Sequence, residues 1–165
     1  MTGTIGRVLT ALTLLAFAAS PAAAQIAHAE ASLGGIGTAI GPAGGLYLDW
    51  AGAGAVLPTT FVVLESQVFQ SNATEFVAMG GVRQQLFRSS KGNLYGQVLF
   101  GLALGYPGYC GLCHPRVTEL GLGANVALNE HWAVRARADM RVGGSAADLF
   151  YPTLGVGLTR TWGAR

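Results

Sequence analysis

The sequence predicts an all-β fold, a single up-and-down antiparallel transmembrane β-barrel of eight strands preceded by a cleaved signal peptide. Residues 132–142 are apolar at every even position and charged at four of the five odd positions, which is the period of a strand with two unlike faces. The same alternation recurs along the chain. Charged residues make up only 11% of the sequence, against about 25% in soluble domains, so a membrane-facing exterior is favoured.

Residues 1–24 are predicted to be the signal peptide, and residues 25–165 the barrel domain. Arg7 supplies the basic start, residues 8–20 form the apolar stretch, and Pro21-Ala22-Ala23-Ala24 offers an A-x-A cleavage site. The apolar stretch is shorter than the ~20 residues that a membrane-spanning helix needs. A cleaved signal is therefore favoured over an anchor, and the remainder is long enough for one domain.

Eight strands follow from the alternation, and turn signals separate them. Their expected ranges are 27–40, 46–56, 60–70, 75–87, 94–106, 117–128, 132–142 and 152–162. Eight is the smallest even number of strands in bacterial outer-membrane barrels. Eleven residues at about 3.4 Å each, tilted by about 45°, rise about 26 Å, close to the ~25 Å apolar band of such barrels.

The first strand, 27–40, has the least regular pattern. Its small apolar residues begin at odd positions, as far as Leu33, while His28 shares the other face with two polar residues. We expect a bulge at Gly34-Gly35 that resets the parity, so that Ile36 and Ile40 join the apolar face.

The other strands are each justified by an apolar even face. On this face, strand 46–56 carries Leu46, Leu48, Trp50 and Val56, strand 60–70 carries Val62, Leu64 and Val68, and strand 75–87 carries Phe76, Ala78, Val82 and Leu86. Strand 94–106 carries Leu94, Val98, Phe100, Leu102, Leu104 and Tyr106, and strand 117–128 carries Leu120, Leu122, Val126 and Leu128. Strand 132–142 carries Trp132, Val134, Ala136, Ala138, Met140 and Val142, and strand 152–162 carries Leu154, Val156, Leu158 and Trp162. In 60–70, Phe61, Val63 and Phe69 are apolar as well, so either face of that strand could be buried.

Aromatic residues lie on the even face near strand ends, as expected of a membrane-interface girdle. With both termini in the periplasm, Trp132 and Trp162 would lie at the periplasmic rim, and Phe76 and Tyr106 at the outer rim. The loops 107–116 and 143–151 would then face outward. The turns at 57–59, 88–93 and 129–131 would face inward, toward the periplasm.

The odd face would line the interior and carry an equal number of acidic and basic side chains. These predicted lumen charges are Asp49, Glu65, Arg83, Glu119, Arg135, Arg137, Asp139 and Arg141. Buried charges persist when they are paired and hydrogen-bonded, and an eight-stranded barrel is just wide enough for its own side chains. Glycines at 101, 105, 121, 123, 155 and 157 would leave room beside the arginines. A plug of ion pairs is favoured, with a small gated channel as the alternative.

The stretches 80–87 and 94–101 resemble the middle of OmpA-type outer-membrane β-barrel domains, and the stretch 120–140 resembles their sixth and seventh strands. They read Gly-Gly-Val-Arg-Gln-Gln-Leu-Phe, Leu-Tyr-Gly-Gln-Val-Leu-Phe-Gly, and Leu-Gly-Leu-Gly-Ala-Asn-Val-Ala-Leu-Asn-Glu-His-Trp-Ala-Val-Arg-Ala-Arg-Ala-Asp-Met. The resemblance implies residence among outer-membrane lipids and assembly by the barrel-insertion machinery. It also implies a structural, adhesive or small-solute role, with a surface ligand bound through the outer loops.

Cys110 and Cys113 are the only cysteines, and His114 follows them. A disulfide is favoured because exported proteins meet an oxidising compartment. The C-x-x-C-H pattern also matches covalent haem attachment, with His114 as axial ligand. A redox or metal role stays open, although two thiols and one histidine leave a structural zinc site one ligand short. No cofactor is expected.

Other functions are less well supported. His114, Ser145 and Asp148 could supply the residue types of a lipid A-modifying barrel enzyme, but scattered loop polar residues are usually solvated, so no enzymatic activity is expected. The net charge is only +2 and the basic residues are dispersed, which argues against nucleic-acid binding. The competing fold is a soluble periplasmic lipocalin-like barrel of opposite parity, with Arg135, Arg137 and Arg141 in water and the even face lining an apolar pocket.

Overall fold

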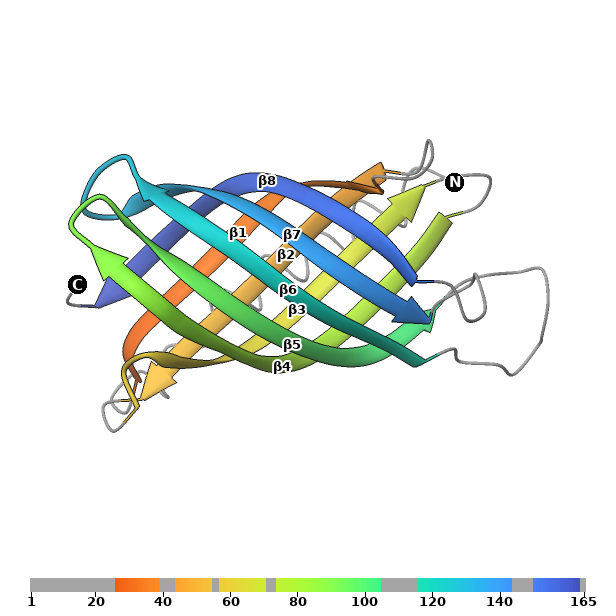
Figure 1. Cartoon of the computed structure of the whole chain (residues 1–165), viewed down its shortest axis with the longest axis horizontal. Helices are drawn as coiled ribbons and strands as arrows, with labels where there is room; N and C mark the ends of the chain where they lie inside the picture. The colour runs from red at the N-terminus through yellow and green to blue at the C-terminus, as the bar shows by residue number, and fades with distance from the viewer. Residues whose placement is uncertain are drawn as a thin grey trace, which may run out of the picture.

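A computed structural model describes residues 26–38, 44–54, 57–70, 74–104, 116–143 and 150–163. The strands are β1 (Ile26–Thr38), β2 (Gly44–Gly54), β3 (Thr60–Gln70), β4 (Thr74–Ser89), β5 (Gly92–Leu104), β6 (Arg116–Ala127), β7 (Trp132–Gly143) and β8 (Phe150–Gly163). Each strand pairs antiparallel with the next, and β8 pairs with β1 to close a barrel (Figure 1). The predicted all-β, eight-stranded, up-and-down barrel is confirmed. The described residues contain no helix long and apolar enough to cross a membrane.

The strand boundaries differ most from expectation at the β4–β5 hairpin. The pairing continues through Ser89↔Gly92, so only two residues form the turn that was expected to occupy 88–93. Gly92 has a φ of 152°, in the region that favours glycine. The backbone oxygen of Asn125 would lie 2.0 Å from a Cβ there. Both facts show why the hairpin has glycine at this position.

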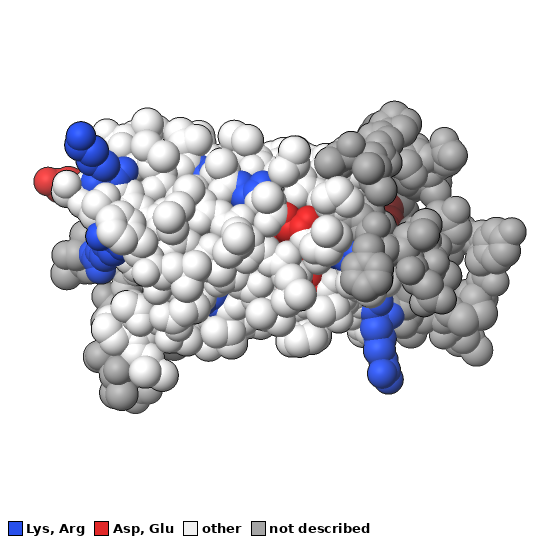
Figure 2. All heavy atoms as spheres, in the orientation of Figure 1, with Lys and Arg blue, Asp and Glu red and all other residues white. Residues whose placement is uncertain are grey.

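From β2 to β8, side chains alternate between the interior and the exterior with odd positions inside, except in β4 after Gln85. In β3, which was ambiguous, Phe61, Val63 and Phe69 are buried, whereas Val62 and Leu64 are exposed. On the face shown in Figure 2, the exterior between the barrel ends is mostly uncharged, and a few Lys, Arg, Asp and Glu atoms are visible between the outward side chains. The apolar even face expected from the sequence is the outer face of the barrel.

The parity reset expected at Gly34-Gly35 is wrong. The β1–β2 and β1–β8 registers run without a break through these glycines, and the only irregularity in β1 lies between Ile26 and His28. Ile36 therefore points inward, where it is buried with Tyr47 and Phe69. Gly34 instead leaves space for the Tyr47 ring, since a Cβ there would lie 2.7 Å from Tyr47 Cε1. Ile40 lies outside the described residues.

A bulge that the sequence did not reveal lies in β4. Gln85 pairs with Tyr95 and Phe87 pairs with Leu94, so Leu86 is the inserted residue. Leu86 and Phe87 are both exposed, and the next residue, Arg88, is also exposed but lines a small cavity at this end of the barrel. A bulge of this kind redirects the side chains that follow it.

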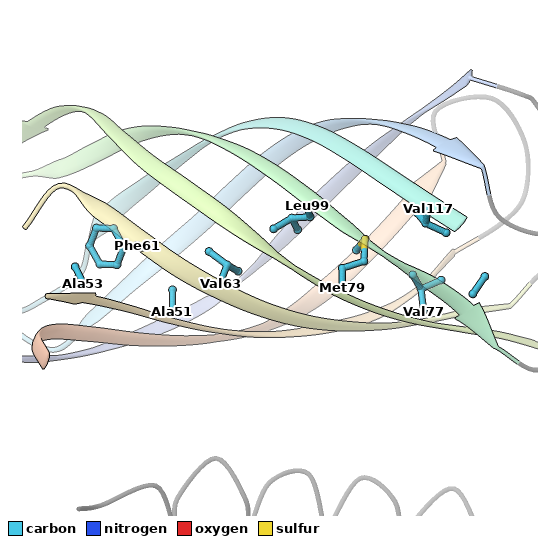
Figure 3. Packing of buried hydrophobic residues seen from close by; sticks show 9 residues of the cluster. Ala51, Ala53, Phe61, Val63, Val77, Met79, Leu99 and Val117 are labelled. Atoms are coloured by element: carbon cyan, nitrogen blue, oxygen red, sulfur yellow. The ribbon is translucent and has the colours of Figure 1, made fainter. Parts of the chain in front are cut away.

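The interior has an apolar part and a charged part. The apolar cluster comes from β2 to β6 and includes Phe61, Val63, Met79 and Leu99 (Figure 3). Strand β7 instead contributes the buried charged residues 135, 137, 139 and 141. Because the apolar cluster fills one part of the lumen, the ionic side chains occupy the remaining space.

Candidate functional site

The candidate site is the charge network inside the barrel. The structure places all eight lumen charges named from the sequence in the interior, together with Glu30, and none of these nine residues is more than 4% exposed. They come from β1, β2, β3, β4, β6 and β7, so their contacts cross the lumen and connect strands that are not neighbours in the sheet.

One cluster joins two arginines to two carboxylates. Arg135 donates to Asp49 Oδ2 at 2.5 Å and to Glu30 Oε1 at 2.7 Å. Arg83 donates to Asp49 Oδ2 at 2.5 Å and also to Glu30 Oε1. Each carboxylate thus lies between two guanidinium groups, one from β4 and one from β7. The two positive and two negative charges balance, as a group removed from water requires.

A second cluster is centred on Arg137. Its Nη1 donates to both oxygens of Glu65 at 2.7 Å, its Nε donates to Asp139 Oδ2 at 2.6 Å, and its Nη2 donates to Glu119. Arg141 also reaches Glu119, at 3.1 Å. Within this cluster three carboxylates face two guanidinium groups.

Two glutamines complete the network. Gln67 Nε2 donates to Glu65 at 2.5 Å and to Glu119 at 3.2 Å. Gln97 accepts from Arg83 Nε at 3.1 Å through its carbonyl oxygen and donates to Asp139 at 3.2 Å through its amide nitrogen. Gln97 therefore links the two clusters into one continuous network.

Each of the four arginines also packs against an aromatic ring. Arg83 and Arg135 lie 4.6 and 5.1 Å from the centroid of Tyr95. Arg137 lies 5.0 Å from that of Tyr47, and Arg141 lies 4.4 Å from that of Phe69. Such cation–π contacts contribute more when the cation is desolvated. The rings hold the guanidinium planes in place beside their carboxylates.

Glycines make room for side chains in the interior, but few of them lie beside an arginine. A Cβ on Gly123 would lie 2.3 Å from Tyr95 Cζ, and one on Gly157 would lie 2.5 Å from Tyr47 Oη. Only Gly155, where a Cβ would meet Arg137 Cγ at 2.9 Å, directly accommodates an arginine. The expectation that these glycines lie beside long arginines is therefore wrong for Gly101, Gly121, Gly123 and Gly157, and Gly105 lies outside the described residues.

Sequence reasoning missed Glu30 as a member of the network. Glu30 lies at an even position, and the lumen residues were chosen from odd positions. The signal was nonetheless present, because Ala29 and Ala31 mark the odd face of β1 as the apolar, outer one. With Glu30 included, the two clusters hold five carboxylates and four guanidinium groups, so the equal balance expected from the sequence is not observed.

Two of the four proposed girdle residues lie together at one rim. Trp132 and Trp162 are 40% and 37% exposed, and the guanidinium of Arg160 lies 5.6 and 5.3 Å from their ring centroids. Phe76 is half-buried near the start of β4, at the opposite rim. Tyr106, Cys110, Cys113, His114, Ser145 and Asp148 lie outside the described residues.

Comparison with models of known protein families found no match, and comparison with curated protein sequences found none either. Solved structures do match. The N-terminal β-barrel domain of OprF from Pseudomonas aeruginosa superposes with a TM-score of 0.58 at 13% identity, covering 84% of this chain and 99% of that one. The outer membrane protein Ail from Yersinia pestis, in a phospholipid bilayer nanodisc, gives 0.58 at 10% identity, covering 82% and 99%.

A de novo designed transmembrane β-barrel matches as well, with a TM-score of 0.55 at 12% identity, covering 84% of this chain and 98% of that one. A designed sequence shares no ancestry with this chain, so its match reflects the architecture alone. At these identities the likeness concerns the fold. The chain has the eight-stranded barrel fold of OmpA-type outer-membrane proteins.

Proposed function

We propose that this protein resides in the bacterial outer membrane, with a structural or surface-interaction role exercised through its outer loops. The observation that carries the proposal is the apolar exterior, which includes Leu64, Leu122 and Val156 at 60% exposure or more. Soluble monomers seldom expose contiguous apolar patches beyond a few hundred Å². In a bilayer the same surface contacts acyl chains, and a closed barrel leaves no strand edge unpaired.

The interior supports a barrel without a wide pore. Arg83 on β4 and Arg135 on β7 reach across to the same carboxylates on β1 and β2. These contacts bridge the lumen where side chains already fill an eight-stranded barrel. Passage of a solute would require several buried ion pairs to separate, which is costly when it leaves a charge unpaired. A plug is thus better supported than the alternative of a small gated channel.

The soluble lipocalin-like alternative is contradicted by the side-chain directions. It requires the even face to line an apolar pocket and the β7 arginines to meet water. Instead Leu122 is 64% exposed and Arg135 is fully buried. The lipid A-modifying alternative rests on His114, Ser145 and Asp148, outside the described residues, so the proposal includes no enzymatic activity.

The proposal extends to export and assembly: cleavage of residues 1–24, contact with outer-membrane lipids, and insertion by the barrel-insertion machinery. Fractionation of cells expressing the full chain tests it. We expect the protein in the carbonate-resistant membrane pellet, with different electrophoretic migration before and after boiling. Release with the periplasmic fraction would contradict membrane residence. In planar bilayers, a large steady conductance would contradict the closed lumen without contradicting the localisation.

A further inference from the structure

The β4–β5 and β6–β7 turns lie at the same end of the barrel, on the left of Figure 1. This end contains a small polar cavity, here called the mouth cavity. Its volume is about 40 Å³, enough for a few waters or one small polar group. Ten residues line it, among them Gln85, Arg88, Asn93 and Asn125. None of these residues is acidic.

The bulge at Leu86 brings a positive charge to this cavity. Without the inserted residue, the alternation of β4 would direct Arg88 outward with the other even positions. With it, Arg88 lines the mouth cavity. The Arg88 side chain forms no ion pair or hydrogen bond within the described part of the chain. A bulge that redirects a side chain is a common device near binding sites.

A chain of amides that starts at Arg135 determines which atoms face the cavity. Arg135 Nε donates to Asn125 Oδ1 at 2.8 Å, and Asn125 Nδ2 donates to Asn93 Oδ1 at 3.0 Å. Arginine is only a donor, so the orientation of Asn125 is fixed, and that of Asn93 follows from it. The remaining group of Asn93 is its NH₂, which makes no hydrogen bond within the described residues.

The direction of these hydrogen bonds favours an anion in the cavity. Hydrogen bonds in series polarise one another, and this series begins at a guanidinium and ends in N–H groups at the cavity. Arg88 adds a second, fully charged donor. Gln85, also in the lining, has a side-chain amide without a partner among the described residues. The left end of the molecule in Figure 2 shows several groups of Lys and Arg atoms and one group of Asp or Glu atoms.

We propose that the mouth cavity binds one small oxyanion, a carboxylate or phosphate group, held by Arg88 and by the amide NH₂ of Asn93. Charge-assisted hydrogen bonds to an oxyanion are about twice as strong as neutral ones. Arg88 and the Asn93 NH₂ present only donors, which an oxyanion satisfies through its lone pairs. The site adjoins the buried ion pairs through Arg135 and Asn125, and it does not depend on membrane residence.

The test is a titration of the folded, isotope-labelled protein in phosphate-free maltoside micelles, followed by NMR at the Asn93 side-chain amide. Sodium acetate, inorganic phosphate and sodium chloride are titrated separately at matched ionic strength. We expect saturable shifts with acetate or phosphate. Arg88→Gln should raise the apparent Kd about tenfold or more, because it removes a charged hydrogen bond to the anion.

Lys91→Gln is the matched control, since it removes the same charge from the same hairpin without touching the cavity lining. It should leave the Kd nearly unchanged, and Asn93→Asp, which replaces the donor by a carboxylate, should abolish binding. Each variant must show the heat-modifiable migration of the wild type. Shifts that do not saturate, or equal weakening by Arg88→Gln and Lys91→Gln, would overturn the proposal and indicate only diffuse attraction to a basic rim.

A parallel sample in phosphatidylglycerol nanodiscs, without added anion, distinguishes two sources of the oxyanion. If the Asn93 amide already shows the saturated shift there, a lipid headgroup occupies the site. If it shows the empty-state shift and responds to acetate or phosphate, the site takes a free anion. Both results support an oxyanion site. No response to any of these anions in either sample would contradict it.

Discussion

The ring of Tyr95 covers Gly123, its partner across the β5–β6 ladder. A Cβ on Gly123 would lie 2.3 Å from both Cζ and Oη of the tyrosine. The same ring carries the guanidinium groups of Arg83 and Arg135. One glycine in the wall therefore determines where the ring lies, and the ring supports both cations of the first ion-pair cluster.

Gly123→Ala should destabilise the barrel by about 1–3 kcal/mol, the usual cost of overpacking an interior, because the ring of Tyr95 must move away from its arginines. Gly96→Ala is the control, since a Cβ there points outward and would meet Leu122 Cδ2 at an ordinary 3.6 Å. Urea unfolding in lipid vesicles, followed by tryptophan fluorescence, measures both. Equal stability of the two variants would show that the Tyr95–Gly123 contact does not matter.

Arg135→Gln should destabilise the barrel by about 3–5 kcal/mol, because it leaves Glu30 and Asp49 buried with a single guanidinium between them. Adding Asp49→Asn should recover part of the loss, since the remaining charges again balance in number. The same urea titration measures the single and the double variant. Strictly additive losses would indicate that Arg135 and Asp49 do not interact.

Arg160→Gln is the matched control for this pair of variants. Arg160 lies on the exposed face between Trp132 and Trp162, so its removal uncovers no buried carboxylate. It should change the unfolding midpoint much less than Arg135→Gln does. A comparable loss would imply that the rim contact, rather than the interior network, dominates the stability.

The fold could be predicted from the sequence because the period of two is nearly unbroken and the two faces differ strongly in polarity. Trp132 to Val142 sets the parity, and the same parity places Asp49, Glu65 and Glu119 inside. The ambiguous strand 60–70 was resolved only by its neighbours, since Phe61 and Val62 are both apolar. Once β2 and β4 direct their odd positions inward, Phe61 must follow.

Errors in the prediction arose where glycines or a bulge interrupt the pattern. Gly34 and Gly35 carry no side chains, so the parity of Ile36 could not be read locally and the long-range register decides it. The insertion of Leu86 leaves no mark on the composition, yet it reverses the direction of Arg88. The pairing of the lumen charges could not be predicted either, because Arg83 and Glu30 are far apart in sequence and meet only across the closed barrel.

Cys110 and Cys113 lie outside the described residues, so their pairing stays a prediction. We expect a disulfide and no haem. The purified protein should show no absorbance in the Soret region, and reduction should raise its mass by two hydrogens. A Soret band that survives denaturation would instead establish covalent haem at Cys110, Cys113 and His114.

The most direct test of the account is the environment of Leu122, on the outer face of β6. A nitroxide attached to Leu122→Cys, in a background without Cys110 and Cys113, is examined in lipid vesicles by power-saturation EPR. We predict strong relaxation by oxygen, which concentrates in the bilayer, and weak relaxation by a water-soluble nickel chelate. Strong relaxation by the nickel chelate would mean that this face is in water and would contradict the proposed placement in the membrane.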